Sequence, residues 1–237
     1  MLDIMEPTPP LVQLASRADQ EFNDLGDFIY KVPRLIESER ELELAKLDLY
    51  FPDDAKRREL RWTHESHKLD HVFPYLIAVG NLFALLSLFE SYLLLLCFEL
   101  QLYTTVQLNG IHGTGVNRFF KFLRRVGIAV EDLPLNQQVQ AAIKIRNCLI
   151  HASGILSWSH NNDDLRELQQ TGAYLSPENQ GVRTRQGGEY IYIHTSALGD
   201  RLMVRNEYCD VLCFYLRTYL VALCGKAEGM MVPVLPG

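Results

Sequence analysis

The sequence has no excess of positive charge. Its 23 Lys and Arg residues are outnumbered by 29 Asp and Glu residues, which gives a formal net charge of −6 at pH 7. This balance excludes a protein that grips nucleic acid with its whole surface. Any contact with nucleic acid must therefore come from a local basic patch.

Cysteine is scarce, and no targeting segment is visible. The five cysteines are odd in number, and most lie inside apolar, helix-like runs. They predict buried, reduced thiols and not a disulfide framework. The N-terminal stretch MLDIMEPTPP is acidic and proline-rich, which is the opposite of a signal peptide. Together these features predict a cytoplasmic protein.

One apolar run, residues 75–103, is long enough to span a bilayer. Asn81, Glu90 and Glu99 interrupt it. Because a carboxylate at mid-membrane costs roughly 2.5–3.5 kcal/mol, a core helix that is hydrophobic on nearly all sides explains the run better. We therefore expect no membrane contact.

Strong metal and nucleotide motifs are also lacking. His64, His67 and His71 share one helical face, but they lack the His-Glu-x-x-His spacing and lie in a highly charged segment. We interpret this face as solvated. The segment GIHGTG is glycine-rich without a following Lys-Ser/Thr, so it predicts a loop and not a phosphate cradle. We expect neither a metal nor a cofactor.

Helical periodicity dominates what is present. Pro52 with Asp53 and Asp54 is a typical helix start, and Pro74 is expected to break or kink the helix that follows. Tyr190 to Ile193 has strand character, and GVRTRQGGEYIYIH predicts two strands around Gln186-Gly187-Gly188. The helices that we expect cover residues 11–30, 33–50, 53–72, 75–103, 116–127, 135–154 and 206–225.

The predicted fold class is therefore all-α, a helical bundle with a small β-hairpin before the C-terminal helix. We expect residues 1–52 to form an N-terminal helical extension and residues 53–237 to form one compact helical domain. Asn206 is the expected N-cap of the last helix, and Gly225 is its expected end.

The stretch RNCLIHASG, residues 146–154, breaks the local pattern of its helix. At 100° per residue, Arg146 falls at about 340°, in the middle of the apolar face, while Asn147 and His151 fall on its edge at about 80° and 120°. A buried arginine needs a partner, because an unpaired buried charge is very costly. Glu90 is the most economical partner, with Ser91 as a secondary polar group nearby.

These three residue types suit phosphodiester cleavage without metal. A histidine exchanges protons near neutral pH, so His151 can take a proton from a ribose 2′-hydroxyl and then serve the leaving oxygen. Arg146 offers a planar fork of donors to phosphate oxygens, and Asn147 can hold the imidazole or contact the phosphate. The alternative is a structural Arg–carboxylate pair and a helix-end histidine that caps carbonyls. Spacing alone leaves both interpretations open.

IRNCLIHASG resembles the R-x4-H signature of the HEPN superfamily, including the polar residue that commonly follows the arginine. The likeness covers roughly residues 72–225. Within it, LFALLSLFESYLLLLC resembles the long helix before the motif, GTGVNRFFKFLRRVGI the linking segment, and GEYIYIHTSAL with the final helix the tail.

The resemblance implies a bundle in which two protomers pair so that both motifs line a shared cleft. Many members are metal-independent endoribonucleases, and Arg146, Asn147 and His151 would be the functional set. Many are toxins beside a cognate antitoxin, which makes an antitoxin a candidate partner, and others take part in phage defence. Some are inactive scaffolds, so a catalytically silent interaction module is the alternative function.

Two further expectations concern surfaces. Arg118, Lys121 and Arg125 share one helical face, with Arg124 beside them, and would contact the RNA backbone if the enzyme interpretation is correct. A solvated helix face is the alternative. The long apolar run is too apolar on all sides for one small bundle to cover. We therefore expect a homodimer whose contact includes that helix and the motif helix.

Overall fold

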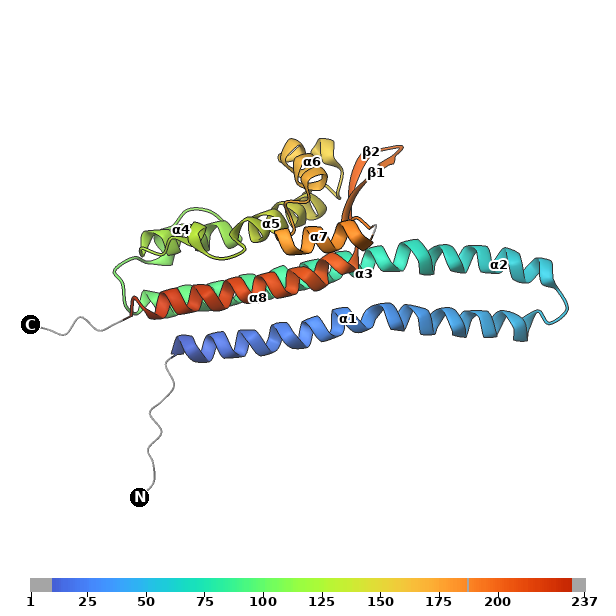
Figure 1. Cartoon of the computed structure of the whole chain (residues 1–237), viewed down its shortest axis with the longest axis horizontal. Coiled ribbons are helices and arrows are strands. Elements are labelled where there is room, and N and C mark those ends of the chain that lie inside the picture. Colours follow the sequence, from blue (N-terminus) through green and yellow to red (C-terminus); the bar gives the residue numbers. More distant parts are fainter. Residues whose placement is uncertain (1–9, 187, 232–237) are drawn as a thin grey trace, which may run out of the picture.

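The computed structural model describes residues 10–186 and 188–231. It is a helical bundle with one antiparallel hairpin before the last helix, as the sequence predicts (Figure 1). The elements are α1 (Pro10–Tyr50), α2 (Ala55–His67), α3 (Phe73–Gln101), α4 (Gly115–Arg125), α5 (Asn136–His151), α6 (Asn162–Thr171), α7 (Pro177–Gln186), β1 (Ile191–Ser196), β2 (Gly199–Val204) and α8 (Asn206–Glu228).

The molecule has a thick body and a thin projection. The first half of α1 lies along α3 and α8 in the body, and its second half runs beside α2, away from the other elements (Figure 1). We call the projecting pair, residues 34–67, the stalk. At its tip the Asp54 carboxylate accepts a hydrogen bond of 2.9 Å from the backbone N–H of Arg57 and caps α2, which starts two residues after the predicted start at residue 53.

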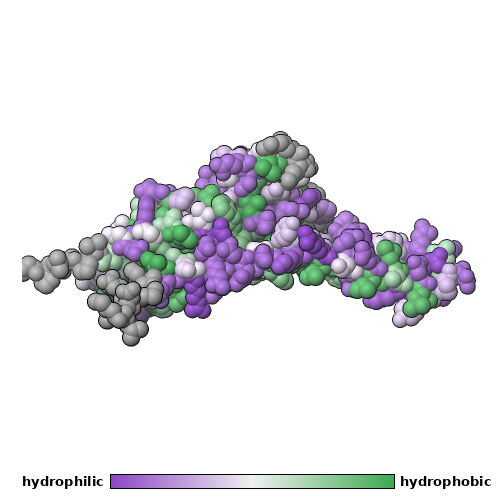
Figure 2. Space-filling model, turned by 60° about the horizontal axis from the view of Figure 1, so that its bottom comes forward, coloured by the Kyte–Doolittle hydropathy of each residue, from purple (hydrophilic) through white to green (hydrophobic). Residues whose placement is uncertain are grey.

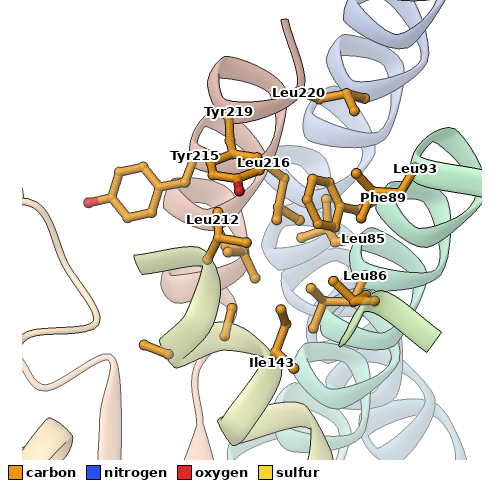
Figure 3. Packing of buried hydrophobic residues seen from close by; sticks show 14 of the residues in the cluster. Leu85, Leu86, Phe89, Leu93, Ile143, Leu212, Tyr215, Leu216, Tyr219 and Leu220 are labelled. Atoms are coloured by element: carbon orange, nitrogen blue, oxygen red, sulfur yellow. The ribbon is translucent and has the colours of Figure 1, made fainter. Parts of the chain in front are cut away.

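The core of the body lies between α3, α5 and α8. Figure 3 shows Phe89 of α3 and Leu216 of α8 pointing toward one another. The Tyr219 ring packs edge-on against Phe89 at 5.9 Å between centroids. Phe22 and Ile29 of α1 belong to the same buried cluster. The expected boundary at residue 52 falls in the α1–α2 connection, and the first half of α1 shares the core of the domain that follows.

Both internal prolines are accommodated without a break in the helix. We expected Pro33 to start a separate helix, but α1 runs through it, because packing on α8 and α2 holds the helix on either side of this exposed residue. Before Pro74, residues Lys68–Val72 form a π-helical turn in which Phe73 N–H donates to the Lys68 carbonyl. This wider turn takes up the proline, so α2 and α3 form one continuous rod.

The hairpin exists, but its predicted position was wrong. Residues 177–186 form α7, and the two strands pair Ile191 with Val204 through Ser196 with Gly199. The strand character of residues 190–193 was interpreted correctly. Its partner follows it in the chain, because the tight turn at residues 197–198 brings β2 back onto it.

The expected ends of the last helix were also displaced. Asn206 is the first helical residue, and its side chain caps nothing. Instead its amide donates to the Ile29 carbonyl at 2.9 Å and its carbonyl oxygen accepts from the Asn81 amide at 2.8 Å. The helix continues past Gly225 to Glu228, because Ala227 is still buried in the core.

By length and composition alone, Ala55–Gln101 and Asn206–Glu228 could each cross a membrane. Core helices of globular proteins meet the same criterion. In this bundle the buried Asn81 joins α3 to the start of α8 through its bond to Asn206, and both helices contribute to the same core. The cysteines are all buried and unpaired, as predicted.

Candidate active site

Arg146 of α5 faces Glu90 of α3. The Arg146 Nη2 atom lies 3.6 Å from the Glu90 Oε2 atom, so the structure contains the pair that the sequence predicts. Its burial differs from the expectation. The two side chains are 26% and 29% exposed, which makes this a half-buried pair and not a fully buried one.

The pair is half exposed because of the face of α5 that carries Arg146. Most of the apolar face around Arg146 is buried, including Ala142 and Ile143, but Ile150, one turn after Arg146, is 42% exposed. Ala141, Ile145 and Cys148, on another side of the helix, are buried. The face with Arg146 therefore borders an open pocket along the last turns of α5, and the core lies to one side of it.

The pocket has a volume of about 130 Å³. It collects the residues that the sequence analysis singled out in the motif, together with the start of α4. Its walls come from three elements that are distant in the sequence, namely α3 with Leu86 and Glu90, residues 114–117, and α5 with Ile143, Arg146, Asn147 and His151.

Gly115 allows the start of α4 to approach the carboxylate. It has a φ of +55°, and a Cβ built there would lie 2.9 Å from the Glu90 Oε1 atom. A side chain at this position would therefore push Glu90 away from Arg146. The glycines of GIHGTG predicted only a loop. The structure shows that Gly115, the last of them, also lets the backbone come close to the Glu90 carboxylate.

Asn147 and His151 occupy different situations in the pocket. The Asn147 Oδ1 atom accepts a hydrogen bond of 3.4 Å from Arg146 Nη1, which orients the guanidinium. His151 is exposed at the end of α5. Within residues 10–186 and 188–231, no hydrogen bond or ion pair holds its imidazole, which lines the pocket.

The end of α5 is closed by its own backbone. The N–H groups of Ala152 and Gly154 both donate to the Cys148 carbonyl, at 3.0 and 3.1 Å. Gly154 has a φ of +79°, the left-handed conformation that ends many helices. The Cys148 carbonyl therefore needs no cap from the His151 side chain.

The strand β2 fixes the turn that follows His151. The Arg201 Nε atom donates to the Ser153 carbonyl at 3.1 Å, and its Nη2 atom donates to the Tyr75 hydroxyl at 3.3 Å. Leu202 N–H donates to the Gly154 carbonyl at 2.8 Å. Burial raises the pKa of Tyr75, so its hydroxyl stays neutral as an acceptor. Arg201 could not be found from the sequence, because nothing local relates it to the motif.

Ser91 does not support the pair as expected. Its side chain is exposed, and its hydroxyl donates to the Ser87 carbonyl of its own helix at 2.9 Å. It is not among the residues that line the pocket. One residue along a helix means a turn of about 100°, which moves Ser91 off the face of Glu90.

Two of the four residues of the predicted basic patch bind the protein's own backbone. Arg118 donates from Nε to the Ile111 carbonyl at 3.1 Å and from Nη2 to the Leu108 carbonyl at 2.9 Å. It therefore holds the loop before α4. Lys121 donates to the carbonyl of His112 at 3.3 Å.

The other two members of that patch are exposed on the last turn of α4. Arg124 forms an ion pair with Glu131. A backbone hydrogen bond, and after it the bond from Arg124, lower the pKa of the Glu131 carboxyl. Arg125 lines a shallow surface hollow with Lys121. Only part of the patch is therefore available to an RNA backbone.

The histidine face of the stalk base was interpreted as solvated. His64, His67 and His71 are all exposed, and the His67 and His71 rings lie 5.3 Å apart. Among the described residues, no group of three or more His, Cys, Asp or Glu side chains is placed to hold a metal ion.

No family model matches the chain, and comparisons with curated proteins and with solved structures find no match. The chemistry of the pocket is therefore argued from its own residues.

Proposed function

We propose that this protein is a metal-independent endoribonuclease of HEPN type, with Arg146, Asn147 and His151 as its catalytic residues. The observation that carries the proposal is their convergence. All three line one open pocket with Glu90, and the histidine has no structural task there. A purely structural Arg–carboxylate pair would not need an unengaged imidazole beside it.

The geometry supports a division of roles. Glu90 and Asn147 each engage one Nη atom of the guanidinium, which holds its plane. An arginine has five N–H donors, so donors remain for the non-bridging oxygens of a phosphodiester. These donors stabilise the charge that develops on phosphorus-bound oxygen during the reaction.

His151 carries the proton transfer. The neutral imidazole takes the proton of a ribose 2′-hydroxyl, the 2′-oxygen bonds to phosphorus, and the bond from phosphorus to the 5′-oxygen breaks. The imidazolium then returns the proton to the 5′-oxygen. The products are a 2′,3′-cyclic phosphate and a 5′-hydroxyl, with no net oxidation or reduction.

A homodimer is the assembly that we propose for this function, with the exposed face of α3 as its contact. This face carries no charged residue. Small residues occupy its middle, and large exposed apolar residues occupy both ends. The small residues are Gly80, Ala84, Ser87 and Ser91, and the large ones are Phe73, Leu76, Leu95, Phe98 and Leu102.

A second copy of α3, packed antiparallel, fits this arrangement. Small residues at the centre allow two helices to approach closely, and the large ends of one helix then meet the opposite ends of the other. Glu90 lies about 100° around the helix from Ser91, so the pocket of each copy would border the edge of the contact. Ala84→Arg should halve the mass measured by light scattering, because it places a charge at the centre of the contact. An Arg at the exposed stalk position Ala45 is the control, and an unchanged mass for Ala84→Arg would count against this interface.

The decisive experiment is RNA cleavage with EDTA present. Wild type should produce 2′,3′-cyclic phosphate ends, and His151→Ala should lose about 10²- to 10⁴-fold in rate, the usual contribution of a positioned acid–base group. His160→Ala, an exposed histidine outside the pocket, is the matched control. Cleavage by His151→Ala at the wild-type rate, or no cleavage by wild type, would reject the nuclease in favour of a silent interaction module.

A further inference from the structure

A second and larger hollow lies where the stalk joins the body. It is a groove of about 860 Å³ between α1, the π-helical turn, the hairpin and the start of α8. It contains three imidazoles, one guanidinium and two tyrosine rings. These are His67, His71, His194, Arg205, Tyr75 and Tyr192.

The basic side chains of the groove are accessible. His67, His71, His194 and Arg205 are exposed, and the Arg205 guanidinium lies 5.2 Å from the centre of the Tyr192 ring. A stacked arginine keeps its charge while its N–H groups point outward. The groove therefore offers positive charge next to flat aromatic surface.

Two carboxylates also line the groove. Asp70 is engaged by Arg40 through an ion pair, which offsets its charge. Glu207, in the first turn of α8, is exposed. Its carboxylate would repel an anion. Neutralising Glu207 should therefore strengthen the binding of an anion, whereas removing Arg205 should weaken it.

Arg201 connects the groove to the turn that follows His151. Tyr75 lines the groove and accepts a hydrogen bond from Arg201, whose guanidinium carbon lies 5.3 Å from the centre of the Tyr75 ring. Arg201 also bonds the carbonyl of Ser153, two residues after His151. A chain that passes His151 and crosses Arg201 would therefore enter the groove.

We propose that this groove binds single-stranded RNA on one side of the cleaved bond. Bases would stack on Tyr192 and Tyr75, and phosphates would meet Arg205 and the histidines, which is how proteins commonly hold unpaired RNA. The identity of the ligand rests on the proposed function. The site replaces the patch on α4 as the main RNA contact, because Arg118 and Arg124 are engaged within the protein.

Binding is tested in the full chain with His151→Ala, so that the RNA stays intact. The probe is a short fluorescein-labelled oligouridylate, and its affinity is measured by anisotropy at low salt. Arg205→Ala and Tyr192→Leu should each weaken binding at least about fivefold, because the first removes a phosphate contact and the second removes the ring on which a base stacks. Glu207→Gln should tighten binding.

Lys56→Ala at the stalk tip is the control, because it removes the same unit of charge away from the groove. It should bind like the parent, and all variants should keep the parent's melting temperature. The proposal is overturned if the parent does not bind the oligonucleotide, or if Arg205→Ala and Tyr192→Leu bind as tightly as Lys56→Ala. If wild type fails to cleave RNA but the groove variants weaken binding, the nuclease function falls and the groove remains.

Discussion

The body and the stalk are both built from helices, but these helices are held in place in different ways. In the body, side chains such as Phe89 and Tyr219 have no exposure to solvent. In the stalk, only Leu47 among residues 34–67 is buried. Leu35, Leu42 and Leu60 are exposed there, and Figure 2 shows such hydrophobic residues scattered among hydrophilic ones at the stalk end.

Local charge pairs take the place of packing in the stalk. Lys46 pairs with Glu43 one turn away, and Arg40 pairs with Glu37 at 3.2 Å. Exposed pairs of this kind contribute little to stability, because water and salt screen the charges. The stalk should therefore open locally far more readily than the body. The candidate active site lies on the body, where packing can hold a guanidinium and a carboxylate in place.

The largest stability difference between the two regions is expected from core truncation. Phe89→Ala should lower the free energy of unfolding by about 3–5 kcal/mol, because it leaves a cavity against Tyr219. Leu49→Ala, at a stalk residue that is 75% exposed, should change it by less than about 0.5 kcal/mol. Urea denaturation followed by circular dichroism measures both. Equal losses would show that the stalk is packed in solution.

An intermediate effect is expected at the half-buried pair. Arg146→Ala should cost about 1–2 kcal/mol of stability, between the values for exposed pairs and for buried ones. It should also abolish cleavage. Arg146→Lys should recover part of the stability but little activity, because the ammonium lacks the fork of donors.

Thermal melting and RNA cleavage of these two variants are compared with Arg61→Ala, an exposed stalk arginine. If Arg146→Lys cleaves like wild type, a point charge is sufficient and the bidentate role is wrong. If Arg146→Ala melts like Arg61→Ala, the pair with Glu90 adds nothing to folding.

The smallest effect on stability is expected in a test of cysteine reactivity, in which the thiols of the body and of the stalk should differ strongly. Burial raises the pKa of Cys213 to about 11 and the pKa of Cys97 and Cys224 to about 12. A raised thiol pKa removes the reactive thiolate, which for Cys213 at pH 8 falls to about one part in a thousand. Native protein should therefore resist iodoacetamide.

A cysteine placed in the stalk sharpens this contrast. Ser38→Cys is exposed and should be alkylated at once, with the melting temperature unchanged. Mass spectrometry at intervals follows both. Rapid alkylation of the native cysteines would mean that the body opens as easily as the stalk.

The sequence by itself determined the elements whose signals are local. Apolar periodicity placed most of the helices, Asp54 marked the start of α2, and Gly127 and Gly154 marked helix ends through their left-handed backbone. The pairing of Arg146 with Glu90 could also be predicted, because two charges in apolar helices have few other solutions.

The tertiary structure alone decided the rest. Whether Pro33 ends a helix, which strand pairs with residues 190–193, and whether Arg118 faces solvent all depend on what lies across the bundle. The tertiary structure also decided the half exposure of Arg146, the approach of Gly115 to Glu90 and the groove at the stalk base. Residues far apart in the chain create them, because a local pattern carries the period of a helix but not the position of the neighbour against which it packs.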